Sequence, residues 1–129
     1  VSYSIMGGMV KKTTSNTNTA EKMVQELRRG TVVLAVFSQL HKEHYGYSLR
    51  QVLEERGFDI NEGTLYPMLR RLETQGLLQS RWETGDGRPR RYYSLSPQGQ
   101  ALFLDLKAEW KYIGVVMEQL LTKNDGGTS

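Results

Sequence analysis

The sequence predicts a mainly helical fold with one small β-hairpin, an α+β arrangement in the order helix, helix, helix, hairpin, long helix. Three observations predict it. Apolar residues recur at three- and four-residue spacing in four segments, as on one face of a helix. A polar, Gly-rich connector at residues 84–89 separates two β-prone runs. With 129 residues, the chain has room for one compact domain.

Composition excludes several classes of protein. The chain has no cysteine, which rules out disulfide scaffolds, Cys-based zinc sites, iron–sulfur clusters and thiol catalysis. Its uncharged stretches, such as residues 30–41, are far shorter than the roughly 20 residues of a membrane helix. The net charge of +3 and the pI near 9.2 favour polyanionic partners, but only mildly.

The N-terminal residues 1–20 are expected to form a flexible arm, because residues 13–19 are Ser, Thr and Asn without an apolar anchor. Within it, residues 1–8 resemble a fusion remnant before a native start at Met9. From Glu21 a helical pattern runs to Leu40 as one predicted helix. Gly30 lies inside it and indicates a bend or a close approach of another helix.

Two shorter helices follow. Ser48 is predicted to open the second helix, with Gln51 three residues later completing a capping box, and Gly57 ends it. Asn61 is predicted to cap the third helix, which ends at Gly76. The buried face of the third helix is predicted to carry four apolar residues: Leu65, Met68, Leu69 and Leu72.

The hairpin strands are predicted at residues 77–83 and 90–95. Leu78 and Trp82 are placed on one face, and Tyr93 and Leu95 on another. Ser96 as N-cap and Pro97 at the first helical position then start a last helix that reaches about residue 121. Residues 123–129 are expected to form a loose tail.

The outer face of the third helix indicates a function. Helical geometry turns Gly63, Pro67, Arg70, Arg71 and Thr74 away from the core, so this face has two arginines and no acid. A basic rod after a tight turn suits entry into the DNA major groove. The alternative is an ordinary solvated face. Pro67 is at odds with helix propensity, and either shapes the end of the helix that meets DNA or reflects a helix start as late as Thr64.

Arginine is concentrated around the hairpin as well. Six of the ten arginines lie between residues 70 and 91, with Arg88, Arg90 and Arg91 around Pro89 and Arg81 on the other strand. The planar arginine fork donates two parallel hydrogen bonds, which suits phosphates and guanine edges. Together the two basic segments favour contact with nucleic acid over a plain solvated surface.

At this point the sequence resembles the PadR-type winged-helix transcriptional regulators, in a short subfamily with a single C-terminal dimerisation helix. The match covers about residues 24–121. It is specific because a Gly-Thr-Leu-Tyr-Pro block and a Gly-Arg-x-Arg-x-Tyr-Tyr block occur at the family's separation. The segments that carry it are LRRGT (27–31), YGY (45–47), GTLYPMLRRLE (63–73), GLL (76–78) and GRPRRYYSLSPQG (87–99).

The resemblance implies a cytoplasmic homodimeric regulator, usually a repressor, that binds two-fold symmetric double-stranded DNA operators and often responds to small aromatic or hydrophobic compounds. It makes residues 21–96 a winged helix-turn-helix domain, with residues 61–76 as recognition helix and 77–95 as wing, and residues 97–122 the dimerisation helix. Tyr66 has an alternative role, packed beside the first helix. The implied DNA-binding residues are Tyr47, Ser48, Asn61, Gly63, Thr64, Tyr66, Pro67, Arg70, Arg71, Arg88, Arg90 and Arg91.

The last helix carries a heptad seam, which predicts a partner helix. The alternative is that the seam packs entirely on the chain's own first helix; Leu102, Val116 and Leu121 widen the apolar surface and favour dimerisation. By resemblance, Trp110 is in addition a candidate ligand-binding residue, since such a tryptophan lines a cavity between subunits in a related regulator; the alternative is a tryptophan that is simply part of the core. The seam consists of Phe103, Leu106, Trp110, Ile113, Met117 and Leu120.

Other chemistries find little support in the sequence. His41 and His44 lack a third metal ligand and are interpreted as surface or capping residues, so neither a metal nor a cofactor is expected. Asp105 and Glu109 form an ordinary charged helix surface, and no enzyme is expected. The competing hypothesis is a winged helix that binds proteins instead of DNA, for which arginines at the wing tip are not needed. Double-stranded RNA is a weaker option, because a helix cannot read its narrow groove.

Overall fold

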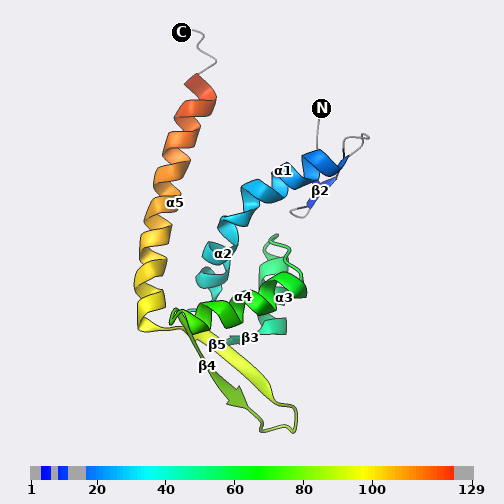
Figure 1. Cartoon of the computed structure of the whole chain (residues 1–129), viewed down its shortest axis with the longest axis vertical. Coiled ribbons are helices and arrows are strands. Elements are labelled where there is room, and N and C mark those ends of the chain that lie inside the picture. The colour runs from blue at the N-terminus through cyan, green and yellow to red at the C-terminus, as the bar shows by residue number, and fades with distance from the viewer. Residues whose placement is uncertain (1–3, 7–8, 12–16, 124–129) are drawn as a thin grey trace.

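The computed structural model describes residues 4–6, 9–11 and 17–123 (Figure 1). Near the N-terminus, β1 (Ser4–Met6) and β2 (Met9–Lys11) pair antiparallel. The expected arm is therefore only partly tested, because residues 1–3, 7–8 and 12–16 lie outside the described residues. Its boundary at residue 20 was too late, since α1 (Thr17–Arg29) already includes Ala20, which is buried.

The helix predicted over residues 21–40 is in fact two helices. α1 ends at Arg29, and α2 (Thr31–Gln39) begins after Gly30. A Cβ at Gly30 would have nothing within 4 Å, so the break marks a change of direction and no close approach of another helix. The Thr31 hydroxyl donates to the Arg28 carbonyl at 2.7 Å, a local side-chain bond that competes with the regular helical pattern.

The next helix, α3 (Gly46–Glu55), starts two residues earlier than predicted. Its N-cap is Tyr45, without a side-chain cap, so the capping box of Ser48 and Gln51 was wrong. The Ser48 hydroxyl instead donates back to the Tyr45 carbonyl at 3.0 Å. The predicted end is confirmed, because Gly57 follows with φ +90°.

The helix α4 (Glu62–Thr74) has the predicted cap, stop and buried face. Asn61 Oδ1 accepts the N–H of Thr64 at 2.8 Å. At the other end Gly76 has φ +82°, and the next N–H, of Leu77, donates to the Leu72 carbonyl at 3.0 Å. The buried residues of α4 are the four predicted ones: Leu65, Met68, Leu69 and Leu72.

A three-stranded antiparallel sheet has the order β3–β5–β4, with β3 (His44–Tyr45), β4 (Leu78–Glu83) and β5 (Arg90–Leu95). The hairpin was predicted; the short β3 was not. Leu78 pairs with Leu95 and Trp82 with Arg91, so Leu78, Trp82, Tyr93 and Leu95 share one face, contrary to the prediction of two faces. A six-residue connector leaves the register open, and register decides which residues share a face.

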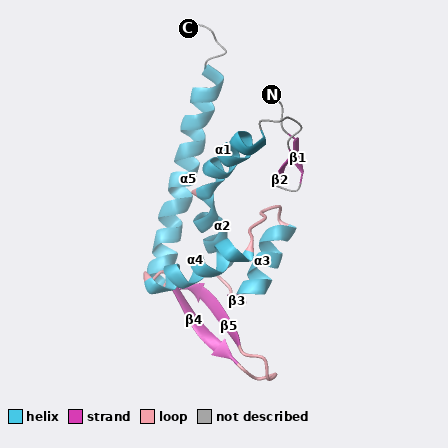
Figure 2. Cartoon of the chain, turned by 45° about the vertical axis from the view of Figure 1, so that its right-hand side comes forward, coloured by secondary structure: helices cyan, strands magenta, loops and turns pink. Residues whose placement is uncertain are grey.

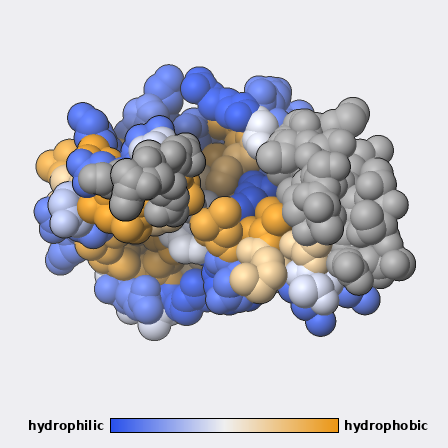
Figure 3. Space-filling view, turned by 90° about the horizontal axis from the view of Figure 1, so that it is seen from above, coloured by the Kyte–Doolittle hydropathy of each residue, from blue (hydrophilic) through white to orange (hydrophobic). Residues whose placement is uncertain are grey.

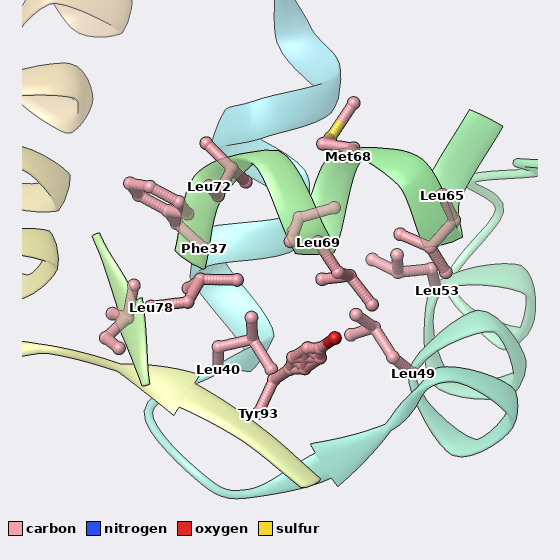
Figure 4. Packing of buried hydrophobic residues seen from close by; sticks show 12 residues of the cluster. Phe37, Leu40, Leu49, Leu53, Leu65, Met68, Leu69, Leu72, Leu78 and Tyr93 are labelled. Atoms are coloured by element: carbon pink, nitrogen blue, oxygen red, sulfur yellow. The ribbon is translucent and has the colours of Figure 1, made fainter. Parts of the chain in front are cut away.

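The core lies between α2, α3, α4 and the base of the sheet (Figure 4). Phe37, Leu40 and Leu49 are fully buried within it, and Tyr93 reaches in from β5. Figure 2 shows the β4–β5 hairpin projecting away from this core as a wing. The arrangement is a winged helix-turn-helix, as predicted.

The last helix, α5 (Pro97–Lys123), begins at the predicted cap, because Ser96 Oγ accepts the N–H of Gly99 at 3.0 Å. Near its start it packs on α2 and β5, with Phe103 edge-on to Phe37 at 6.5 Å between ring centroids. Its C-terminal half and α1 extend away from the core, on the side opposite the wing (Figure 1). No helix among the described residues is both long and apolar enough to cross a membrane.

Candidate nucleic-acid interface

The outer face of α4 is exposed, as predicted. Asn61 caps the helix and Glu62 begins it, so the alternative of a start as late as Thr64 is wrong and Pro67 lies inside the helix. Because proline has no N–H, the Gly63 carbonyl one turn earlier lacks its helical donor. The exposed residues of this face are Gly63, Thr64, Pro67, Arg70, Arg71 and Thr74.

The acids at both ends of α4 are paired with arginines from other elements. Glu62 binds Arg50 of α3 at 3.0 Å, and Glu73 binds Arg91 of β5 at 2.7 Å. Within residues 17–123, no ion pair involves Arg70 or Arg71. The outer face of α4 therefore presents two arginines whose charges no neighbouring acid neutralises.

The wing tip holds its own acid. Asp86 accepts the backbone N–H of Arg88 at 3.1 Å and a guanidinium N–H of Arg90 at 3.0 Å, and these bonds lower the pKa of Asp86, with the backbone bond the larger cause. Arg90 also lies over the Tyr45 ring at 5.0 Å. The side chain of Arg88 is exposed and forms no ion pair among the described residues.

Arg81, on the outward face of the wing, is fully engaged. Its guanidinium donates to both carboxylate oxygens of Glu43 at 2.8 Å and to Glu83 at 2.7 Å, and it lies over the Tyr92 ring at 5.0 Å. The contact lowers the pKa of Glu43, chiefly through the hydrogen bond from Arg81, and raises the pKa of Arg81. Within the residues that the structure describes, the six clustered arginines thus divide into three held by acids (Arg81, Arg90, Arg91) and three without acid partners (Arg70, Arg71, Arg88).

The predicted polar residues differ in how free they are. Tyr47 is 53% exposed and stacks on Tyr45 at 6.4 Å between ring centroids. Tyr66 is half-buried, and its ring lies so close to Gly46 that a Cβ there would overlap it. Its alternative role as a packed aromatic is thus partly realised, but against the start of α3. The Ser48 hydroxyl donates to the Tyr45 carbonyl, and the Asn61 side-chain oxygen accepts the backbone N–H of Thr64.

The two histidines sit at structural positions. His41 Nδ1 lies 3.1 Å from the Ser38 carbonyl near the end of α2, and His44 Nδ1 lies 3.1 Å from Ser48 Oγ. Burial lowers the pKa of His44, and the neighbouring charges of His41 and Lys42 lower it further. In the described part of the chain, no three His, Asp or Glu side chains gather as a metal site would require.

The seam of α5 divides into a packed and an exposed part. Phe103 and Leu106 are half-buried against the chain's own core. Further along, Trp110, Ile113, Met117 and Leu120 are 42–58% exposed, so the alternative of a seam packed entirely on the chain's own first helix is wrong. Figure 3 looks down on this end of the molecule and shows hydrophobic residues exposed over α5 and around the hollow beside it.

One feature of the site has no signal in the sequence. The contact of Glu73 with Arg91 joins residues 18 positions apart, on a helix and a strand whose mutual placement depends on the whole core. Sequence spacing placed Arg91 at the wing tip with Arg88 and Arg90. The structure turns it inward, to the face that also carries Ser80 and Tyr93.

Comparison with known proteins places this geometry in context. A model of the transcriptional regulator PadR-like family matches residues 33–104. The transcriptional regulator Rv3488 of Mycobacterium tuberculosis is 40% identical over 79 residues, which are 60% of this chain and 74% of that protein. A PadR family transcriptional regulator from Eggerthella lenta DSM 2243 superposes with a TM-score of 0.78 at 41% identity, covering 84% of this chain and 96% of that one.

A second solved structure agrees with the first. The PadR family regulator from Clostridium difficile R20291 has a TM-score of 0.66 and 34% identity, and the match covers 71% of this chain and 99% of that one. Nearly the full length of both solved chains is therefore represented in this fold. The likeness includes the winged helix and extends beyond the residues matched by the family model.

Proposed function

Because this chain belongs to the PadR-like family of transcriptional regulators, which are not enzymes, we propose that it acts by binding double-stranded DNA directly. In this proposal α4 enters the major groove and the β4–β5 wing contacts the flanking backbone. The observation that carries the proposal is the distribution of arginines. Acids neutralise Arg81, Arg90 and Arg91, whereas Arg70 and Arg71 on α4 and Arg88 at the wing tip have no acid partner within the described part of the chain.

We assign two different roles to Arg70, Arg71 and Arg88. Arg70 and Arg71 lie on a rigid helix face and are the candidates for reading base edges, where a bidentate contact is worth about 1–3 kcal/mol of discrimination. Arg88 lies on a turn and is the candidate for a phosphate contact, which adds affinity without sequence preference. Tyr47 and Thr64, both exposed, supply hydroxyls at the start of α3 and α4 for further phosphate contacts.

The DNA-binding unit is a homodimer in this proposal. Four seam residues of α5 are exposed in the single chain, and an apolar helix face of this size is stabilised by packing against another helix. The two-fold axis of such a dimer would set two copies of α4 about one helical turn, ~34 Å, apart on one side of the duplex, which calls for a two-fold symmetric operator. Occupying such an operator in the cytoplasm would repress the gene beside it.

A planar hydrophobic effector would bind between the subunits at Trp110. Support comes from the position of this ring, 52% exposed in the middle of α5 and on the proposed dimer face. A ligand that prefers a non-binding dimer geometry by about 1.4 kcal/mol would weaken operator binding tenfold. Planar dyes titrated against tryptophan fluorescence test this: quenching should be lost in Trp110→Ala and kept in Trp82→Ala. The opposite pattern would place the ligand elsewhere.

Selection of bound sequences from a random pool of duplex DNA tests the DNA-binding proposal. The wild-type chain should enrich a two-fold symmetric sequence. Arg70→Ala or Arg71→Ala should relax the preference at particular base pairs, and Arg88→Ala should weaken all sequences alike. Arg56→Ala, which removes an exposed arginine at the far end of α3, is the matched control and should leave the enriched sequence unchanged. Failure to enrich any sequence would favour a protein-binding winged helix instead.

A further inference from the structure

Three polar side chains form a closed network between the recognition helix and the wing. The Glu73 carboxylate on α4 accepts a guanidinium N–H of Arg91 at 2.7 Å with one oxygen and the Ser80 hydroxyl at 2.6 Å with the other. The Nε–H of Arg91 donates to Ser80 Oγ at 3.1 Å, which completes the triangle. Each residue therefore contacts the other two, and one comes from each of α4, β4 and β5.

The network lies where the wing leaves the body of the protein. The side chains of Glu73 and Arg91 are only 25% and 37% exposed, whereas every residue from 81 to 89 is exposed. The Arg91 guanidinium lies 5.6 Å from the Tyr93 ring and 5.7 Å from the Trp82 ring, so it also contacts two aromatic side chains. Partial burial makes these charge-assisted bonds stronger than they would be in water.

The chemistry of the triangle suits an arginine. Two donors held in one rigid plane, Nε and a terminal nitrogen, reach two different acceptors, whereas a lysine would offer all its donors from a single nitrogen. An acid on this helix also carries a cost for a DNA-binding protein. Glu73 lies three residues after Arg70, and a carboxylate there repels a polyanion. A glutamate at position 73 is therefore expected to make a favourable contribution that offsets this repulsion.

We propose that Glu73, Ser80 and Arg91 are positioning residues that lock the wing to α4, so that Arg88 and the α4 arginines engage one duplex together. This rests on the proposed function, because the distance being fixed matters only if both elements contact the same DNA. With the lock formed, the wing is ordered before binding. Without it, the wing must be ordered during binding, at a cost in affinity.

The direction in which one substitution changes DNA affinity distinguishes the lock from a simple effect of charge. Glu73→Gln removes a negative charge beside the DNA and frees Arg91, which by charge alone strengthens binding. The lock predicts the reverse, about tenfold weaker binding to the duplex enriched by the wild-type chain, because a wing that is ordered only on binding loses affinity. Glu55→Gln is the control, since it removes an exposed acid of α3 for which no ion pair is found in the described residues; it should leave affinity equal or slightly higher.

A second pair of variants changes no charge. Ser80→Ala removes the shared hydroxyl and should weaken binding to the same duplex, whereas Ser80→Thr restores a hydroxyl in a residue suited to strands and should return affinity to near wild type. Urea unfolding of each variant shows whether the fold is intact. A purely structural role would move stability without the loss and rescue of affinity in variants that remain fully folded.

The possible results distinguish a failure of the proposed lock from a failure of the proposed DNA binding. If the wild-type chain binds no duplex, both proposals fall. If it binds, and Glu73→Gln binds more tightly or Ser80→Ala binds equally well, the DNA-binding function stands and the lock is wrong. If both variants bind more weakly, with rescue by Ser80→Thr, the lock is supported.

Discussion

Gly99 is the residue at which α5 meets the turn that ends α4. A Cβ built there would overlap the Leu77 carbonyl oxygen and lie 3.0 Å from the carbonyl carbon, both of which are backbone atoms. The same turn receives Ser96, whose hydroxyl donates to the Gly76 carbonyl at 2.6 Å while its oxygen caps α5. A single residue without a side chain therefore sets how closely the last helix approaches the winged helix.

Gly99→Ala should destabilise the protein by about 1–3 kcal/mol, the usual cost of forcing extra atoms into a packed site. Urea unfolding followed by circular dichroism measures the change in free energy of unfolding. Gly30→Ala is the matched control: Gly30 has a helical backbone conformation (φ −70°, ψ −17°) and open space around its Cβ, so alanine there should stabilise by about 0.4–1 kcal/mol. Equal stabilities of the two variants would contradict the close approach at Gly99.

Residue type alone does not reveal which arginines are available. Arg88, Arg90 and Arg91 are alike in sequence, yet only Arg88 lacks an acid partner among the described residues. What separates Arg90 from Arg91 is the alternation of strand faces combined with the hairpin register, and a six-residue polar connector does not fix that register. The sequence therefore predicts a basic cluster but not its division into paired and unpaired charges.

At the scale of elements, helix ends were predicted best where a single residue is enough to begin or end the helix. Asn61 as a cap and Gly57 and Gly76 as stops were predicted correctly, because a side-chain acceptor or a positive φ suffices for each. Prediction was poorer where tertiary packing decides. The strand β3 exists only because β5 provides hydrogen-bonding partners for residues 44–45.

The break between α1 and α2 is a second case of this kind. The apolar pattern continues through Gly30, and the pattern alone indicates one helix. In the structure, however, α2 carries buried Val36 and Phe37 into the core, whereas Leu27 of α1 is 79% exposed. The periodicity shows which residues lie on one helix face, but it does not show how deeply that face is buried. The apolar face of α2 is buried much more deeply than that of α1.

The seam of α5 yields a prediction for assembly. Ile113→Glu and Met117→Glu place charges on the proposed dimer face and should convert a dimer to a monomer, because a buried unpaired carboxylate is strongly disfavoured. Sedimentation velocity at micromolar concentration measures the change. Val115 lies on the opposite side of α5 and is 57% exposed, so Val115→Glu should leave the dimer intact.

Two results would contradict the proposed dimer. The wild-type chain would sediment as a monomer, or Val115→Glu would dissociate the dimer as readily as Ile113→Glu. Circular dichroism of each variant separates loss of the dimer from loss of the fold, since α5 packs on α2 and β5 near its start through residues other than those substituted.

At the scale of the whole molecule, the two ends of the chain's structure have different characters. The wing and the outer face of α4 present arginines that form no ion pair with any described residue, and the C-terminal half of α5 presents exposed apolar residues on the side opposite the wing (Figure 1). Contact with a polyanion suits the first surface, and contact with a second copy suits the other. In the proposed dimer, the separation of the two surfaces would let two copies of α4 and the wing face the same duplex.

The salt dependence of equilibrium binding to duplex DNA tests the central claim most directly. If Arg88 of each chain in a dimer neutralises one phosphate, the logarithm of the binding constant should fall with the logarithm of salt concentration with a slope of roughly −2, and more steeply where Arg70 and Arg71 also displace counterions. Arg88→Ala, present in both copies, should make the slope shallower by roughly 2. Binding that is absent at low salt, or that is insensitive to salt, would contradict the account.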